Sequence, residues 1–133
     1  MDSITVLLVD DEESFVEFLS KRLTTRGMQV STSLSGEAAL EQLRSRAFDV
    51  VILDVRMPGM SGVETLRELK KLRPDTQVIM LTGHASIESG VEGMKLGAFD
   101  YLVKPCDIEV LTKAIHEAHS QRRHAAGPSE GDA

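Results

Sequence analysis

The sequence predicts an α/β fold in which five parallel strands alternate with five helices. Two observations lead to this prediction. Short apolar runs of strand length begin roughly every 21 to 28 residues along the chain. A segment with apolar residues at helical spacing follows each of these runs. This alternation is typical of a parallel sheet with helices on both faces, and right-handed crossovers restrict its topology.

The five predicted strands differ in how deeply we expect them to be buried. The run Val50–Leu53 is continuously apolar and rich in β-branched residues, as in a strand that is covered on both faces. The second run is more polar, so we expect it near an edge of the sheet. The predicted strands are residues 6–9, 28–33, 50–53, 77–81 and 101–103.

Capping signals bound the first two predicted helices. The first begins at Ser14 and ends at Gly27, which is suited to the C-terminal cap of a helix. Ser35 can cap the N-terminus of a second helix that continues to about Ser45.

The third and fourth helices differ in how strongly the sequence favours them. The stretch Ser61-Gly-Val-Glu64 forms a capping box for a helix that Pro74 ends. The fourth helix, residues 86–96, carries Gly90 and Gly93 in its interior. Each glycine costs up to about 1 kcal/mol relative to alanine. The fourth helix therefore has the weakest intrinsic propensity.

The end of the last helix sets the expected domain boundary. Asp107 can cap a fifth helix that runs to about Arg122. The 133 residues are enough for one domain with a sizeable core. We expect residues 1–122 to form this domain and residues 123–133, which are rich in Ala, Gly, Ser and Pro, to form a flexible tail or linker.

Charge and cysteine content limit the function classes. The net charge of −6 argues against direct nucleic-acid binding, which needs a basic surface. A single cysteine, Cys106, excludes an internal disulfide framework and fits a reducing compartment. The N-terminus lacks the pattern of a secretory signal, and no apolar run reaches the length of a membrane span. We therefore expect a cytoplasmic protein without membrane association.

Polar residues follow four of the five predicted strands directly. Asp10 and Asp11 follow the first strand, Asp54 the third, Thr82 the fourth and Lys104 the fifth. Ligands of open parallel sheets bind at the carboxyl ends of the strands. If the second strand lies at the edge, the first and third are neighbours, and the three aspartates face each other.

Three neighbouring carboxylates repel one another, and burial strengthens the repulsion. A divalent cation such as Mg²⁺ resolves this conflict, because it prefers oxygen ligands and also binds phosphate oxygens. Thr82 supplies a hydroxyl donor and Lys104 a cation suited to a phosphoryl oxygen. These groups together suit phosphoryl transfer to an aspartate.

Five separated motifs in this order resemble the receiver domain of two-component response regulators, over about residues 4 to 122. The resemblance implies a flavodoxin-like, doubly wound sheet with strand order 2-1-3-4-5. It also implies a regulatory domain that catalyses only its own phosphorylation and dephosphorylation. The motifs are Leu8-Val-Asp-Asp-Glu12, Val51-Ile-Leu-Asp-Val-Arg-Met-Pro-Gly-Met-Ser-Gly62, Leu81-Thr82, Gly97-Ala-Phe-Asp-Tyr101 and Lys104-Pro105.

The resemblance makes Asp54 the phosphoacceptor and implies Mg²⁺, or Mn²⁺, as its cofactor. Asp11 would bind the metal directly and Asp10 largely through water. Asp54 and the backbone carbonyl of Arg56 would complete the protein ligands.

Further roles follow from the same resemblance. Thr82 and Lys104 would bind the phosphoryl group, and a cis peptide bond before Pro105 would aim the lysine inward. Thr82 and Tyr101 would form the switch. His84, like Arg56, borders the phosphoryl position, and we expect both side chains to modulate the lifetime of the phosphorylated state.

The implied partner is a sensor histidine kinase or a phosphotransfer protein. Phosphorylation would change the surface formed by the helix at 86–96, the strand at 101–103 and the last helix. This surface would control an output partner or effector domain, and it is a candidate homodimer interface. The segment Leu81-Thr-Gly-His84 is similar to receivers at the N-terminus of transcriptional activators.

Other interpretations of these residues are simpler or belong to other classes. The acids at 10–13 alone would suit a solvated helix start. An aspartate-dependent phosphatase needs a second acid where Arg56 stands, and a nucleotide- or flavin-binding module needs a glycine-rich loop after the first strand. A phosphorylation-independent interaction domain stays open. We expect His116 and His119 to lie on a solvated face and Cys106 to be unreactive.

Overall fold

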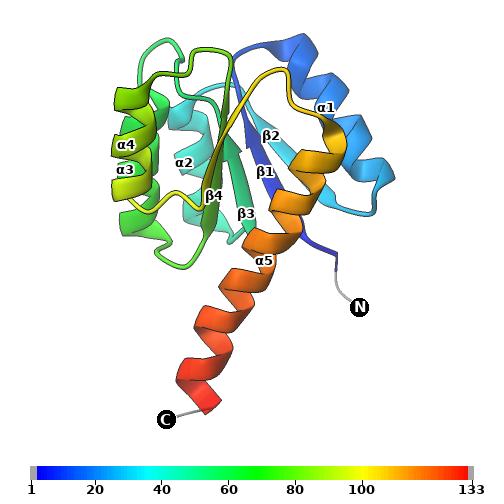
Figure 1. Cartoon of the computed structure of the whole chain (residues 1–133), viewed down its shortest axis with the longest axis vertical. Helices are drawn as coiled ribbons and strands as arrows, with labels where there is room; N and C mark the ends of the chain where they lie inside the picture. The colour runs from blue at the N-terminus through cyan, green and yellow to red at the C-terminus, as the bar shows by residue number, and fades with distance from the viewer. Residues whose placement is uncertain (1–2, 132–133) are drawn as a thin grey trace.

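The structure is a computed structural model that describes the backbone of residues 3–131 and the side chains of residues 3–121. Strands and helices alternate strictly along the described residues (Figure 1). None of the described helices is both long and apolar enough to span a membrane. The elements are β1 (Thr5–Val9), α1 (Glu13–Thr25), β2 (Gln29–Ser33), α2 (Gly36–Ser45), β3 (Val50–Leu53), α3 (Gly62–Leu72), β4 (Gln77–Thr82), α4 (Ile87–Lys95), β5 (Asp100–Val103) and α5 (Ile108–Gly131).

The sheet has the predicted class and topology. Its five strands are all parallel and lie in the order β2-β1-β3-β4-β5, so the flavodoxin-like order is confirmed. The polar strand β2 lies at one edge, as predicted. In the central register Val9 pairs with Leu53, and Leu53 pairs with Met80. The residues that follow β1 and β3 are therefore adjacent at the carboxyl edge.

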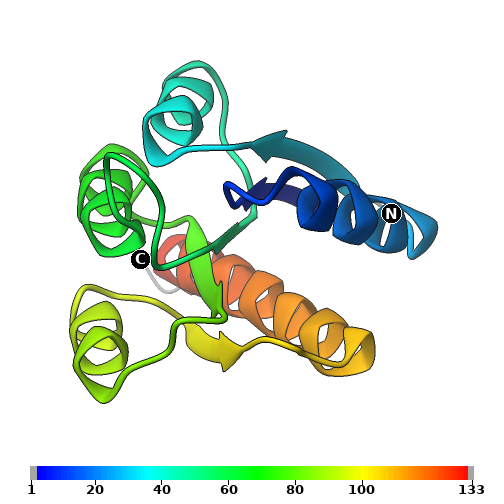
Figure 2. The same ribbon diagram turned by 90° about the horizontal axis from the view of Figure 1, so that it is seen from above.

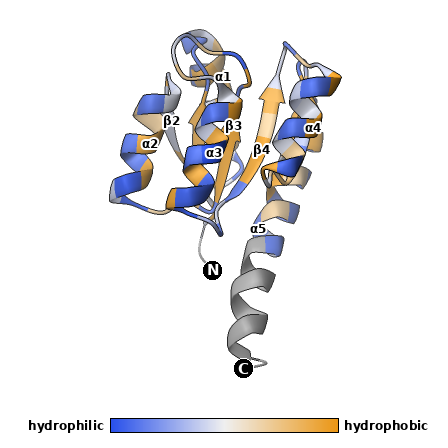
Figure 3. Cartoon of the chain, turned by 90° about the vertical axis from the view of Figure 1, so that its left-hand side faces the viewer, coloured by the Kyte–Doolittle hydropathy of each residue, from blue (hydrophilic) through white to orange (hydrophobic). Residues whose placement is uncertain are grey.

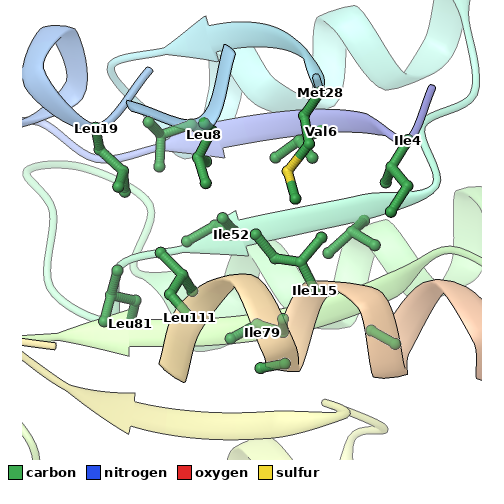
Figure 4. Close-up of a cluster of buried hydrophobic side chains, with 14 of the residues drawn as sticks. Ile4, Val6, Leu8, Leu19, Met28, Ile52, Ile79, Leu81, Leu111 and Ile115 are labelled. Atoms are coloured by element: carbon green, nitrogen blue, oxygen red, sulfur yellow. The ribbon is translucent and has the colours of Figure 1, made fainter. Parts of the chain in front are cut away.

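Helices cover both faces of the sheet. Seen from above, α1 and α5 lie on one face, and α2, α3 and α4 lie on the other (Figure 2). Alternate residues of each strand pack under the two helical layers because successive side chains point to opposite faces. On the α1/α5 face, Leu8, Ile52 and Ile79 come from three adjacent strands and pack toward Leu111 and Ile115 of α5 (Figure 4).

The opposite face carries a second buried cluster. Leu7 and Leu53 of the sheet pack there with Leu43 of α2 and with Leu66 and Leu69 of α3. Figure 3 shows the apolar strands β3 and β4 beside helices whose outward sides are largely hydrophilic. Two such layers hold the central strands rigidly, since both faces of β1 and β3 are buried.

The predicted helix caps are present. The Ser35 side chain accepts a hydrogen bond from the Ala38 N–H, and Ser61 and Glu64 form the reciprocal capping box. The Asp107 carboxylate accepts from the Glu109 N–H at 3.0 Å, which caps α5.

The predicted end of the last helix is wrong. We expected it near Arg122, but the backbone of α5 continues to Gly131. No glycine or proline stands between Arg122 and Ala126, so the helix can pass its predicted end, and its backbone continues through Gly127 and Pro128 as well. The role of residues 123–133 as a linker to another domain stays a prediction.

Gly62, the first residue of α3, lies close to the backbone that follows β3. Its N–H donates a hydrogen bond of 2.7 Å to the Val55 carbonyl. A Cβ atom at this position would lie 2.0 Å from the backbone oxygen of Asp54. No larger residue fits without a shift of the backbone on which Asp54 stands.

We therefore predict that Gly62→Ala lowers the free energy of unfolding by about 1–3 kcal/mol, the usual range for overpacking. Chemical denaturation followed by circular dichroism measures this change. Gly90→Ala is the matched control, because its Cβ would meet only ordinary contacts at 3.9 Å and alanine favours the helix. Equal stability of Gly62→Ala and the parent chain would contradict the role of this close approach.

Candidate phosphoacceptor site

Three carboxylates meet at the carboxyl edge of the sheet, as predicted. Asp10 and Asp11 follow β1, and Asp54 follows β3. The Asp54 N–H donates to the Val9 carbonyl at 3.0 Å, which continues the pairing of the two strands. One oxygen of each acid lies within 4.8 Å of the others. Asp10 and Asp54 are only 1% and 4% exposed, whereas Asp11 is exposed.

Backbone N–H groups orient the two buried carboxylates. Asp54 Oδ1 accepts a hydrogen bond of 2.9 Å from the Val55 N–H. Asp10 Oδ1 accepts one of 3.0 Å from the Glu12 N–H. Each contact uses one oxygen, so both side chains have a fixed direction.

Burial raises the pKa of Asp54 above its ordinary value, and the negative charge of Asp10 raises it further. The Thr82 side chain, the Lys104 charge and the Val55 N–H oppose this rise without cancelling it. The charged form of Asp54 is therefore less favourable here than in water, and nearby positive charge would stabilise it.

The donor set fits a hard divalent cation. The three acids offer only oxygen ligands, and their mutual repulsion is what a cation would relieve. Within residues 3–121, Asp10, Asp11 and Asp54 form the group of potential ligands that are close enough to share an ion. His116 and His119 are not part of this group, and His119 Nε2 instead lies 3.8 Å from a carboxylate oxygen of Asp49.

Lys104 reaches into the site from the loop after β5. Its peptide bond to Pro105 is cis, the geometry that the family resemblance implies. The ammonium lies 2.7 Å from Asp10 Oδ2 and 3.2 Å from Glu12 Oε1. Burial lowers the pKa of Lys104, but its contacts with Asp10 and Glu12 and the charge of Asp54 outweigh this effect and raise it.

Thr82 is the last residue of β4. His84 lies in the loop that follows β4, and Arg56 lies in the loop that follows β3. The Thr82 side chain is fully buried, and its Oγ1 accepts a hydrogen bond of 3.0 Å from the His84 N–H. His84 and Arg56 are exposed. Arg56 Nη1 lies 3.4 Å from His84 Nδ1, so these side chains join the loops that follow β3 and β4.

Tyr101, the candidate switch residue, lies half-buried against α4. Its hydroxyl is 2.6 Å from Ser89 Oγ and accepts a longer hydrogen bond of 3.4 Å from the Ser86 N–H. A methyl group at Gly90 would lie 3.9 Å from the ring, an ordinary van der Waals contact, so the backbone of α4 lies close to the ring. The position of Tyr101 is therefore tied to the first turns of α4.

Sequence reasoning missed three contacts at this site. Glu12 pairs with Lys104, the Lys104 ammonium lies 4.0 Å from the centre of the Phe15 ring, and Ser89 binds Tyr101. Glu12 directly follows Asp10 and Asp11, and this adjacency is the only feature of the sequence that could have indicated its contact with Lys104. Phe15 looked like an ordinary core residue of the first helix.

The surroundings of Cys106 disfavour the ionised form of its thiol. Burial, and then the negative charges of Asp107 and Asp100, raise its pKa. A raised pKa disfavours the thiolate, which is the reactive form.

Comparisons with known proteins agree with this geometry. A family model described as the response regulator receiver domain matches residues 6–116. The transcriptional regulatory protein ZraR of Escherichia coli O157:H7 is 44% identical over 117 residues, which cover 88% of this chain and 26% of that protein. The chain thus spans about a quarter of the length of this relative.

Solved structures of receivers have the same fold. The receiver domain protein of Methanospirillum hungatei JF-1 superposes with a TM-score of 0.90 at 28% identity, covering 93% of this chain and 99% of that one. A response regulator of Burkholderia pseudomallei gives a TM-score of 0.82 at 29% identity, covering 96% of this chain and 75% of that one. Fold, site geometry and the family match agree, and this chain belongs to the response regulator receiver domains of two-component systems.

Proposed function

We propose that this domain is a phosphorylation-activated switch that accepts a phosphoryl group on Asp54. The donor would be a phosphohistidine of a sensor histidine kinase or of a phosphotransfer protein. The observation that carries the proposal is the convergence of Asp10, Asp11, Asp54 and Lys104 at one edge of the sheet. A relative supports it, because the Burkholderia pseudomallei protein is described with a phosphorylated aspartic acid and a calcium ion.

In the transfer step, a carboxylate oxygen of Asp54 attacks the phosphorus atom of the phosphohistidine. A phosphorus–oxygen bond forms while the phosphorus–nitrogen bond breaks, and the histidine nitrogen leaves with the electron pair. The Val55 N–H holds Asp54 Oδ1 in place, which leaves the second oxygen as the nucleophile. Catalysis then consists mainly of positioning and charge neutralisation.

Asp10, Asp11, Asp54 and the backbone carbonyl of Arg56 would hold Mg²⁺ or Mn²⁺. A bound cation supplies positive charge to the carboxylates and to the phosphoryl oxygens. Lys104 would pair with the phosphoryl group, and the Thr82 hydroxyl would donate a hydrogen bond to it. The domain would catalyse only its own phosphorylation and dephosphorylation.

The switch would run from Thr82 to Tyr101 and α4. A phosphoryl group adds about −1.5 to −2 charge and three acceptor oxygens, toward which Thr82 and Lys104 would move. The helix α4 is weakly anchored, because Gly93 is its only buried residue. Such an element suits two alternative positions.

The surface that would change carries apolar side chains. Ile87, Val91 and Met94 of α4 are 88%, 50% and 48% exposed, and Val103 of β5 is 53% exposed. Exposed apolar groups gathered in one place are typical of interaction sites. We propose that this surface of α4, β5 and α5 controls an effector domain or forms a homodimer, and that the chain is the N-terminal receiver of a transcriptional activator.

The first test is direct phosphorylation. With acetyl phosphate and Mg²⁺, intact-mass spectrometry should detect one added phosphoryl group on the parent chain. Asp54→Asn, which removes the nucleophile and keeps the shape, should gain none. Chelation of Mg²⁺ should prevent the modification of the parent chain. A modification that persists in Asp54→Asn would refute Asp54 as the acceptor.

Arg56 and His84 should prolong the phosphorylated state, because their paired side chains limit the approach of water. We predict that Arg56→Ala and His84→Ala each shorten the lifetime of the aspartyl phosphate by about two- to fivefold, the effect of one partly exposed contact. The decay of radiolabelled phosphoprotein gives this lifetime. Arg44→Ala, an exposed arginine on α2, is the control. Unchanged lifetimes in both variants would rule out this role.

Phosphorylation should alter the protection of α4. We predict that hydrogen exchange of α4 amides changes by at least about threefold on phosphorylation, because opening rates follow local stability. The internal reference is α3, whose Leu66 and Leu69 are fully buried. Mass-spectrometric exchange of both states measures this difference. Equal protection of α4 in the two states would count against its role as the moving element.

A further inference from the structure

The described residues that contact the Lys104 ammonium come from the junction of β1 and α1. The ammonium lies 2.7 Å from Asp10 and 3.2 Å from Glu12, and it lies 4.0 Å from the centre of the Phe15 ring. Asp54 acts on it through charge alone, since no ion pair joins the two within the described residues. The lysine therefore rests on the β1 side of the site.

The three contacts of the Lys104 ammonium would change differently when a cation and a phosphoryl group bind at the site. Asp10 is a candidate metal ligand, so a bound cation would neutralise the carboxylate that now holds Lys104. Phe15 attracts the ammonium only through the weak electrostatic effect of its ring. Glu12 keeps a full negative charge. Once the cation and the phosphoryl group are bound, Glu12 is the remaining carboxylate that competes with the phosphoryl oxygens for Lys104.

We propose that Glu12 is a positioning residue that restrains Lys104 on the β1 side and so slows phosphorylation of Asp54. This inference rests on the proposed function and adds a residue that sets its rate. The Glu12 side chain is 64% exposed, whereas Lys104 is only 16% exposed. Glu12 can therefore release the lysine by swinging into solvent, and the restraint is partial.

The Glu12 side chain makes no hydrogen bond on which α1 depends. Glu12 occupies the N-cap position, but its side chain makes no capping hydrogen bond. Its contact with Asp10 uses the backbone N–H, which a substitution would keep. Glu12→Gln therefore removes the charge opposite Lys104 and preserves the local fold.

The test compares initial rates of phosphorylation by acetyl phosphate with Mg²⁺, followed by intact mass over hours so that slow rates are resolved. Glu12→Gln should react about two- to fivefold faster than the parent chain, the range expected from one partly exposed ion pair. Glu13→Gln is the matched control. It removes the neighbouring exposed charge but has no ion pair to Lys104, so its rate should stay at the parent value.

A second comparison asks whether Glu12 acts through Lys104. In a Lys104→Met background, Glu12→Gln should no longer change the rate. Equal acceleration in both backgrounds would overturn the proposal, because Glu12 would then act only by repelling the anionic donor. No acceleration in the parent background, or the same acceleration by Glu13→Gln, would overturn it as well. Absence of any Asp54-dependent phosphorylation would instead refute the proposed function.

Discussion

The parallel pairing of β1 with β3 is the constraint on which the site depends. Both strands are buried on two faces, so the residues that follow them cannot separate. Asp10 and Asp54 therefore remain together, buried, although their charges repel. The raised pKa of Asp54 reflects the unfavourable energy of this arrangement. The hydrophobic core keeps two acids close together, where a cation or phosphoryl chemistry can use their charge.

The surrounding groups are held less firmly than the strands that carry the acids. Lys104 lies on a loop and its ammonium contacts Glu12. Arg56 contacts His84 at the exposed surface of the site. Tyr101 is tied through Ser89 to α4, a helix that buries little of its own surface. This division suits the proposed function, since a phosphoacceptor needs a fixed nucleophile and a switch needs parts that move at low cost.

Much of the fold could be predicted because local signals agreed with the tertiary structure. The apolar run Val50–Leu53 identified a central strand, and Ser35 and the capping box at Ser61 marked the starts of two helices. The end of α5 could not be predicted from composition, because its backbone continues through Gly127 and Pro128, residues that usually mark the end of a helix. The position of Asp54 at the end of its strand followed from the sequence, but its burial and the side on which Lys104 rests did not.

The sequence by itself determined the order of the elements, the identity of the acids and the strand ends at which they stand. These properties are local, since they depend on apolar periodicity, on caps and on the residue that follows each strand. Only the tertiary structure decided which side chains touch. Glu12 with Lys104, and Ser89 with Tyr101, meet because of sheet order and helix placement. The physical reason is that contacts between distant segments depend on side-chain direction and packing, which no single stretch of sequence encodes.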